Sequence, residues 1–185
     1  AWPAGKIYLV FTSLSMSKPG TSELFLKAYE DYSDAIFRFC YVRVRQRDLA
    51  LDITQETFIK TWEYLRADKE VRNLRAFLYQ VARNLITDYS RKKKESSLDN
   101  LMNHGFDAPT DDDHQLYDVL DVKYLVRIIQ GMDGKYRDVI LMRYVDELPI
   151  KEIADIIGES KNVVSVRIHR GLQQVRNLIP KSNGS

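Results

Sequence analysis

The residues best suited to chemistry lie toward the C-terminus, where Lys161, Ser165, His169 and Arg170 recur about one helical turn apart. Cations and small polar groups donate hydrogen bonds to phosphates and base edges, which is the chemistry of nucleic-acid recognition. The other side of this segment is apolar at helical spacing: Val164, Ile168, Leu172 and Val175. The spacing predicts a helix with one buried stripe and one polar face that contacts DNA. A helical hairpin with a solvated basic face is the alternative.

The preceding segment completes a helix-turn-helix pattern. The predicted first helix, 150–157, carries four residues on its inner side: Ile150, Ile153, Ala154 and Ile157. Gly158 follows at the point where the chain must turn, and glycine adopts a positive φ at the lowest cost. Ser160 can then cap the second helix, 160–179. The small alanine, the glycine and the apolar positions together favour DNA binding.

Length and composition set wider limits. A chain of 185 residues can form one domain or two small ones, and its net charge of +2 is too small to identify a nucleic-acid binder. The single cysteine, Cys40, lies in an apolar run, which predicts a buried thiol and fits a reducing cytoplasm. No stretch approaches the roughly 18 apolar residues of a membrane helix, so no membrane insertion is expected. Residues 1–21 are expected to be an N-terminal extension, in which 1–15 are interpreted as sequence added before a natural start at Met16, with an extra N-terminal strand or arm as the alternative.

Apolar periodicity predicts three further helices, over 22–44, 52–65 and 74–94, with a polar loop at 67–73. The first carries Leu24, Ala28, Tyr32, Ile36, Phe39 and Cys40 on its apolar stripe. The second turns Ile53, Phe58, Thr61, Trp62 and Leu65 inward. The third is the most regular, with Leu74, Phe77, Leu78, Val81, Leu85 and Tyr89 on one side, and Tyr89 is assigned to the core.

Composition changes at Glu95. Residues 107–121 contain six aspartates and no lysine or arginine, and Gly105 and Pro109 interrupt regular structure. Residues 95–118 are therefore predicted to be a flexible acidic linker. A second domain, 119–180, follows with helices at about 119–132, 134–145, 150–157 and 160–179, and 181–185 form a tail. The expected fold class is all-α, with two small helical domains, 22–94 and 119–180.

The runs DITQETFIKTW (52–62) and LRAFLYQVARNLITDYSRKKK (74–94) resemble region 2 of bacterial sigma factors of the sigma-70 family. The helix-turn-helix resembles region 4. Since only a short acidic linker lies between them, the chain resembles the extracytoplasmic-function, or group 4, branch over residues 22–180. The resemblance implies a protein that binds core RNA polymerase, directs it to promoters and helps to melt the −10 element.

The resemblance also implies a surface that docks on the β′ coiled coil of the polymerase, made of Asp52, Gln55, Glu56 and Phe58, with Trp62 supporting it. A second polymerase contact, with the β flap, is implied as well. Asp52 and Glu56 are i, i+4 neighbours, so they form an acidic patch that suits a basic partner. A solvated helix N-terminus is the alternative interpretation.

The third helix and the loop before it correspond to the part of the family that engages the −10 element. Asn84 matches a position that holds a flipped base, and an amide can pair with a base edge as donor and acceptor. The loop residues Lys69, Arg72 and Asn73 are expected to help form the base pocket. Basic residues suited to phosphates are Arg83, Arg91, Lys92, Lys93 and Lys94.

Region 4 would read the −35 element as duplex DNA through Ser160, Lys161, Asn162, Ser165, Val166, Arg167, His169 and Arg170. Arg170 or Lys161 suits guanine, and Asn162 suits adenine or a phosphate. Arg167 either forms a salt bridge or contacts DNA. Glu159 departs from the family pattern in the turn and is unfavourable near phosphates, so the register of base contacts stays open.

Catalysis is not expected. His104, His114 and His169 are scattered, and no phosphate-binding glycine loop or nucleophile motif occurs in the sequence. No cofactor, metal or catalytic residue is predicted. The expected partners are RNA polymerase core, promoter DNA and an anti-sigma factor that covers both domains. The alternatives are a stand-alone helix-turn-helix regulator, which would leave the 52–62 patch unexplained, and a module whose main partner is another protein.

Overall fold

A computed structural model describes residues 20–99 and 120–178 of the chain. These residues form two compact helical units, here called the first unit (20–99) and the second unit (120–178), and neither range contains a strand. The expected all-α fold with two helical domains is confirmed. The expectations for residues 1–19, for most of the linker and for the C-terminal tail lie outside the described residues.

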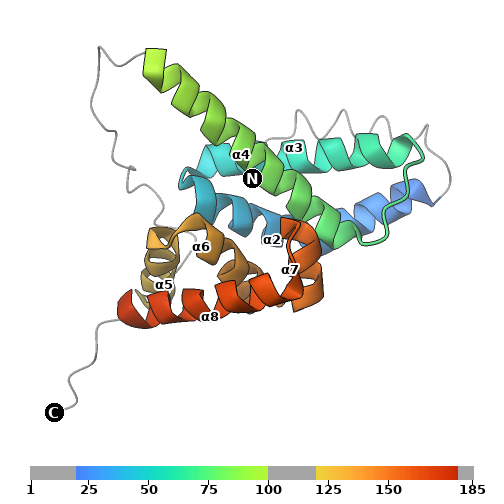
Figure 1. Cartoon of the computed structure of the whole chain (residues 1–185). Helices are drawn as coiled ribbons and strands as arrows, with labels where there is room; N and C mark the ends of the chain where they lie inside the picture. Colours follow the sequence, from blue (N-terminus) through green and yellow to red (C-terminus); the bar gives the residue numbers. More distant parts are fainter. Residues whose placement is uncertain (1–19, 100–119, 179–185) are drawn as a thin grey trace. The chain divides into compact units, whose positions relative to one another are not determined.

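The first unit consists of α2 (Thr21–Val44), α3 (Arg47–Arg66) and α4 (Leu74–Asp99), and each of these helices packs against the other two (Figure 1). Aromatic rings join them. Phe25 of α2 lies 5.1 Å from Trp62 of α3 between ring centroids, and Phe39 of α2 lies 5.2 Å from Tyr79 of α4. Edge and tilted contacts of this kind stabilise a core beyond the area that they bury.

Helix α3 runs through the middle of this core. Its predicted inner face is confirmed, because Ile53, Phe58, Thr61, Trp62 and Leu65 are all buried. Three buried threonines, Thr54, Thr57 and Thr61, donate their hydroxyl hydrogens to the carbonyl four residues earlier, at 2.7, 2.7 and 2.8 Å. These bonds satisfy the hydroxyls inside α3 itself, so the helix can be buried without polar partners elsewhere. It begins at Arg47, five residues before the predicted start.

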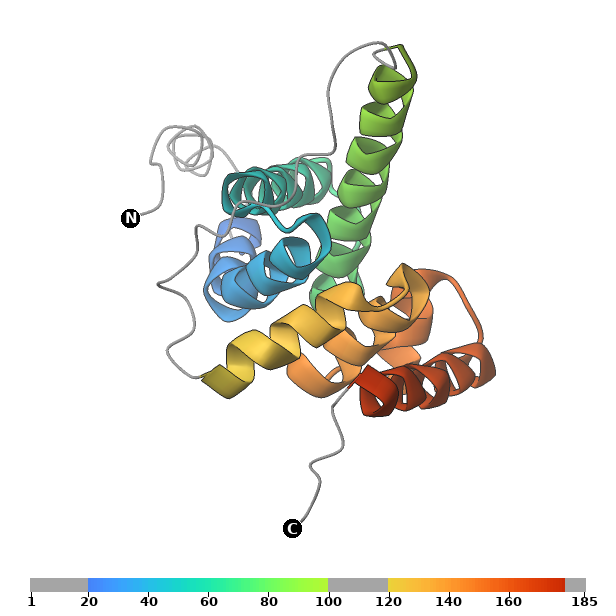
Figure 2. The ribbon, with the colours of Figure 1, turned by 90° about the vertical axis from the view of Figure 1, so that its left-hand side faces the viewer.

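Helix α4 differs from the prediction in two respects. It continues to Asp99, so the first residues of the expected linker are helical. Its most buried residues are Leu78, Tyr79, Ala82 and Ile86, whereas Tyr89 is 38% exposed and its assignment to the core was wrong. Figures 1 and 2 show the C-terminal end of α4 extending beyond α2 and α3. Tyr89 lies where this packing ends, and it lines an open cleft with Val44 of α2 and Leu49 of α3. At the start of α2, Leu24 is likewise exposed rather than buried.

The second unit consists of α5 (Leu120–Gly131), α6 (Gly134–Ile140), a π-helical turn η1 (Leu141–Val145), α7 (Ile150–Ile157) and α8 (Lys161–Leu178). The predicted helix over 134–145 is therefore one α-helix that widens at its end, where the Asp146 N–H reaches back five residues to the Leu141 carbonyl at 3.1 Å. The core of the second unit contains fully buried residues from four elements and from the segment between η1 and α7: Val139, Met142, Ile153 and Val164, with Leu148 in that segment.

A glycine sets how closely α8 approaches α6. Gly171 is buried, and a Cβ atom added to it would lie 2.7 Å from Cγ1 of Ile140 and 3.5 Å from Cβ of Tyr136. Any side chain at this position would therefore push α8 away from α6. Further along α8, Leu172 and Val175 are only half-buried, although both were expected in the core.

Candidate nucleic-acid interface

The turn between α7 and α8 has the geometry that its residues predict. Gly158 ends α7 with a φ of +70°, and its N–H donates to the Ala154 carbonyl. Ser160 caps α8, since its Oγ accepts a hydrogen bond of 3.3 Å from the Val163 N–H. These two contacts fix the direction in which α8 leaves the turn.

The polar face of α8 is exposed. It carries Lys161, Asn162, Ser165, Val166, His169 and Arg170, beside the exposed Ser160 of the turn. Ser165 donates its hydroxyl hydrogen to the Lys161 carbonyl at 2.9 Å, so its oxygen can still accept. A ring nitrogen of His169 lies 3.2 Å from Nε2 of Gln173, which extends this polar face by one turn beyond the predicted residues. Val166 is 50% exposed and adds an apolar contact such as a thymine methyl group requires.

Arg167 is the exception on α8. Its Nη2 lies 2.6 Å from Oε1 of Glu159, so of the two alternatives for this residue the structure has the salt bridge. The same contact places the Arg167 guanidinium against the carboxylate of Glu159, the turn residue whose negative charge is unfavourable beside phosphates. Seven of the eight predicted −35 residues thus face solvent, and the eighth is half-buried and paired within the turn.

A groove of about 350 Å³ runs beside this face, between α6 and α8. Two of its lining residues, Lys135 and Tyr136 of α6, were not among the predicted site residues. Lys135 Nζ lies 4.9 Å from the Tyr136 ring centroid and 3.3 Å from Oδ2 of Asp133. The hydrogen bond from the Lys135 backbone N–H lowers the pKa of the Asp133 carboxyl, which caps α6. Lys135 and Tyr136 precede the helix-turn-helix in the sequence, and no pattern there indicates that they lie beside α8.

In the first unit, a side chain of the loop before α4 joins one from α3 and one from α4 in a layered arrangement. Lys69 Nζ lies 4.9 Å above the Tyr64 ring, and Tyr64 lies 4.7 Å from Phe77 between ring centroids. Asn73 caps α4, because its Oδ1 accepts from the Ala76 N–H at 3.0 Å. The structure therefore gives Asn73 a capping role that the sequence interpretation did not include, while Arg72 is exposed.

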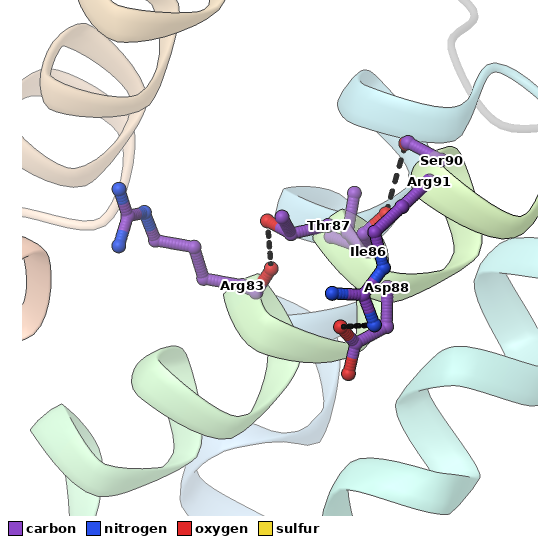
Figure 3. A network of polar contacts seen from close by, with 6 residues as sticks. All are labelled: Arg83, Ile86, Thr87, Asp88, Ser90 and Arg91. Carbon is purple, nitrogen blue, oxygen red and sulfur yellow. Dashed lines mark hydrogen bonds and ion pairs between the residues drawn. The ribbon is translucent and has the colours of Figure 1, made fainter. Parts of the chain in front are cut away.

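The face of α4 that carries Asn84 is also polar and open. Asn84 is exposed, and Figure 3 shows the Arg83 side chain extended away from α4. Arg91 instead lies against Asp88, with 3.2 Å between Nη2 and Oδ1. The hydroxyls of Thr87 and Ser90 donate to carbonyls one turn back, at 2.8 and 2.9 Å. Lys92 and Lys93 are exposed and lie on the helix, while the side chain of Lys94 falls outside the described part of the chain.

The predicted polymerase-docking surface is only partly exposed. Asp52 is exposed, and the half-exposed Glu56 pairs with Lys60 at 3.3 Å. Gln55, Phe58 and Trp62 are buried, with 6%, 3% and 2% of their surface exposed. Phe58 and Trp62 pack against the aromatic side chains of Phe25 and Tyr29 on α2, and docking on the polymerase through this set of residues stays a prediction.

Residues 20–99 and 120–178 contain no group of three histidine, cysteine or carboxylate side chains placed to hold a metal ion. Cys40 is buried, and burial raises the pKa of its thiol to about 12, although a hydrogen bond with Thr54 and the charge of Arg43 oppose this rise. Within the described ranges, every helix is too short or too polar to cross a membrane.

Comparisons with known proteins agree with this division. Residues 28–96 match the family described as Sigma-70 region 2, and residues 123–175 match Sigma-70, region 4. The ECF RNA polymerase sigma factor SigW of Bacillus subtilis is 31% identical over 172 residues, which cover 88% of the chain and 92% of SigW.

Two solved structures share the fold. The sigma factor RpoE of Bartonella quintana, in complex with the anti-sigma factor NepR, superposes with a TM-score of 0.72 at 19% identity, over 86% of the chain and 98% of RpoE. CnrH, in complex with the cytosolic domain of CnrY, gives a TM-score of 0.65 at 19% identity, over 98% of the chain and all of CnrH.

Proposed function

The chain belongs to the ECF RNA polymerase sigma factors of the sigma-70 family, and from this premise we propose that it binds core RNA polymerase, directs it to a bipartite promoter and helps to melt the −10 element. A sigma factor is an initiation factor, so the chemistry of RNA synthesis would belong to the polymerase. The proposed site of action is the cytoplasm. Only residues 97–122 separate the two matched regions, which supports placement in the group 4 branch.

The second unit would read the −35 element. Helix α8 has the form of a recognition helix, because its N-terminal turns carry exposed polar residues and its other side packs into the core. Arg170 and Lys161 are the candidates for guanine, and Val166 is the candidate for a thymine methyl group. The Glu159 contact turns Arg167 toward the turn, so Arg167 supports α8 rather than reading a base.

The first unit would hold the melted −10 strand. Asn84 and Arg83 are adjacent on α4, Asn84 exposed and Arg83 half-buried, and the amide would pair with a base and the guanidinium with a phosphate. The Lys69–Tyr64–Phe77 layer at the preceding loop adds a cation above aromatic rings, which suits an unstacked base. Arg91, Lys92 and the loop residue Arg72 would bind the backbone.

Polymerase docking would involve a smaller surface than the five residues that the resemblance implies. Asp52 and Glu56 are accessible and would pair with a basic surface of the β′ coiled coil, with Lys60 displaced from Glu56. Gln55, Phe58 and Trp62 would instead hold α3 in position. The second unit would contact the β flap.

An anti-sigma factor is the proposed regulator. The neighbour RpoE was solved in complex with the anti-sigma factor NepR, and CnrH in complex with the cytosolic domain of CnrY. The exposed faces of α4 and α8 are the surfaces that an inhibitor would have to cover to block promoter recognition.

One observation carries the proposed function: a single chain presents an exposed Asn84 face on α4 and an exposed recognition face on α8, within the two matched regions and in that order. A stand-alone helix-turn-helix regulator would need only the recognition face on α8.

Run-off transcription from a genomic promoter library tests it, with purified core polymerase and with or without the full chain. New start sites that share one bipartite upstream sequence are expected. Asn84→Ala should lower open-complex formation, and Arg170→Ala should change which promoters are used. Asn177→Ala, an exposed control at the end of α8, should act as wild type. Duplex binding without core-dependent initiation would favour the regulator.

A further inference from the structure

A basic cleft of about 210 Å³ lies in the first unit at the joint between α2 and α3, away from every residue assigned a role above except Lys93. Its polar lining comes from two parts of the chain: Arg43 and Gln46 at the joint, and Tyr89, Ser90 and Lys93 on α4. Helix α4 continues past Ile86, the last buried residue among those whose side chains are described, and so brings Tyr89 and Lys93 to the joint.

The joint itself is unusually cationic. Arg45 ends α2 in the left-handed conformation, with a φ of +59° and its N–H bonded to the Tyr41 carbonyl at 2.8 Å. Glycine or asparagine is the common residue at such a position. Exposed Arg45 and Arg47 flank Gln46, and the nearest acid in the sequence is Asp48. The cleft thus opens among cations from both α4 and the joint.

The lining groups decide the class of ligand. A guanidinium, an ammonium, an amide and a phenol together provide hydrogen-bond donors around a concave site, and two of them are charged. Cations would repel a metal ion, and a lining this rich in polar groups does not suit an apolar ligand. Phosphate oxygens accept from all four groups, and arginine with lysine is the usual pair that binds them. We propose that this cleft binds a phosphate group.

The cleft is distinct from the Asn84 face. Arg91 and Lys93 are two residues apart, so at 3.6 residues per turn they point about 160° away from each other around α4. Arg91 pairs with Asp88, whereas Lys93 lines the cleft with Arg43. The basic run at the end of α4 therefore serves two surfaces. The phosphate could belong to the backbone of nucleic acid or to a small phosphorylated molecule, and the two sources give different experimental results.

The variants for the test are Lys93→Gln, which removes a cleft cation, and Gln46→Glu, which places a carboxylate among the cleft donors. Gln46 is far along the chain from the Asn84 face and has no other assigned role. Lys27→Gln is the matched control, because Lys27 is an exposed cation of α2 outside the cleft. Circular dichroism establishes that each full-length variant is folded.

In the first arm, fluorescence anisotropy follows a single-stranded oligonucleotide binding to the full chain at several salt concentrations. If the phosphate is that of nucleic acid, Lys93→Gln lowers the slope of log K against log salt by about 0.7, and Gln46→Glu weakens binding several-fold. Lys27→Gln leaves the slope unchanged. In the second arm, pyrophosphate is titrated at constant ionic strength while the backbone amide signals of residues 43–47 and 89–93 are followed by NMR.

Saturable shifts confined to those residues, absent from both cleft variants, identify a small phosphorylated ligand. The proposal is overturned if cleft variants and the Lys27→Gln control behave alike in both arms. Lys93 is also among the predicted −10 residues, so Gln46→Glu is the variant whose result separates the phosphate site from the proposed function.

Discussion

Arg167 and Glu159 join the second helix of the helix-turn-helix to its turn, with 2.6 Å between Nη2 and Oε1 across eight residues of sequence. The two side chains are 25% and 39% exposed, so the pair contributes only about 0.5 kcal/mol to stability. Its larger effect is on recognition, because it keeps one guanidinium out of the set that α8 offers to DNA.

We therefore expect Glu159→Gln to strengthen binding to duplex DNA several-fold. The change removes a carboxylate near the phosphates and releases Arg167, so the slope of log K against log salt should steepen by about 0.9. Anisotropy with a −35 duplex measures both quantities. Glu147→Gln removes the same charge from an exposed position outside the turn and should change little. Equal slopes for the two variants would contradict this role.

Gly171→Ala should destabilise the second unit by about 1–2 kcal/mol, because its Cβ would meet Ile140 at 2.7 Å, and the gain in helix propensity only partly compensates. Urea unfolding of the full chain measures the change. Gly131→Ala is the control, since a Cβ at Gly131 meets nothing within 4 Å. It should leave stability unchanged or raise it slightly. If both alanines acted alike, the close approach of α8 and α6 would be wrong.

Asn73 has two roles that substitutions can separate. Asn73→Ala removes the cap on the Ala76 N–H and should cost about 1 kcal/mol of stability. Asn73→Asp keeps the capping oxygen but loses the amide donors and adds a negative charge, so it should fold normally and bind the −10 strand several-fold more weakly. Thermal unfolding and strand binding are measured on both variants. A destabilised Asn73→Asp would argue against the cap.

The raised pKa of the Cys40 thiol predicts a pH dependence. Burial lifts it from 9.0 to about 12 in the folded chain, so above pH 9 the unfolded chain ionises first. The contribution of the neutral thiol is then fully present below pH 9 and lost as pH rises toward 12, by about 1.4 kcal/mol per unit. The stability difference between wild type and Cys40→Ala should shrink between pH 8 and 10.5 in urea unfolding. If the stability of wild type and of Cys40→Ala fell in parallel over this pH range, the raised pKa of the Cys40 thiol would be refuted.

Local patterns in the sequence determined much of the fold. The order of the helices, the two-unit division, the inner face of α3 and the turn at Gly158 all follow from periodicity and from the conformations that glycine and serine favour. These features depend on neighbours within one or two turns, which a sequence displays directly. The exposed face of α8 follows for the same reason.

Only the tertiary structure decided which side of α4 is buried. Tyr79 and Tyr89 are both aromatic residues of α4, yet Tyr79 packs against Phe39 and is buried, whereas Tyr89 lines an open cleft at the joint between α2 and α3. The burial of Gln55, the contact of Gly171 with Ile140 and the cleft shared by Gln46 and Lys93 also join residues whose packing no local pattern encodes. Periodicity shows that a helix has an inner side, but the length and placement of its neighbours determine where that side stops.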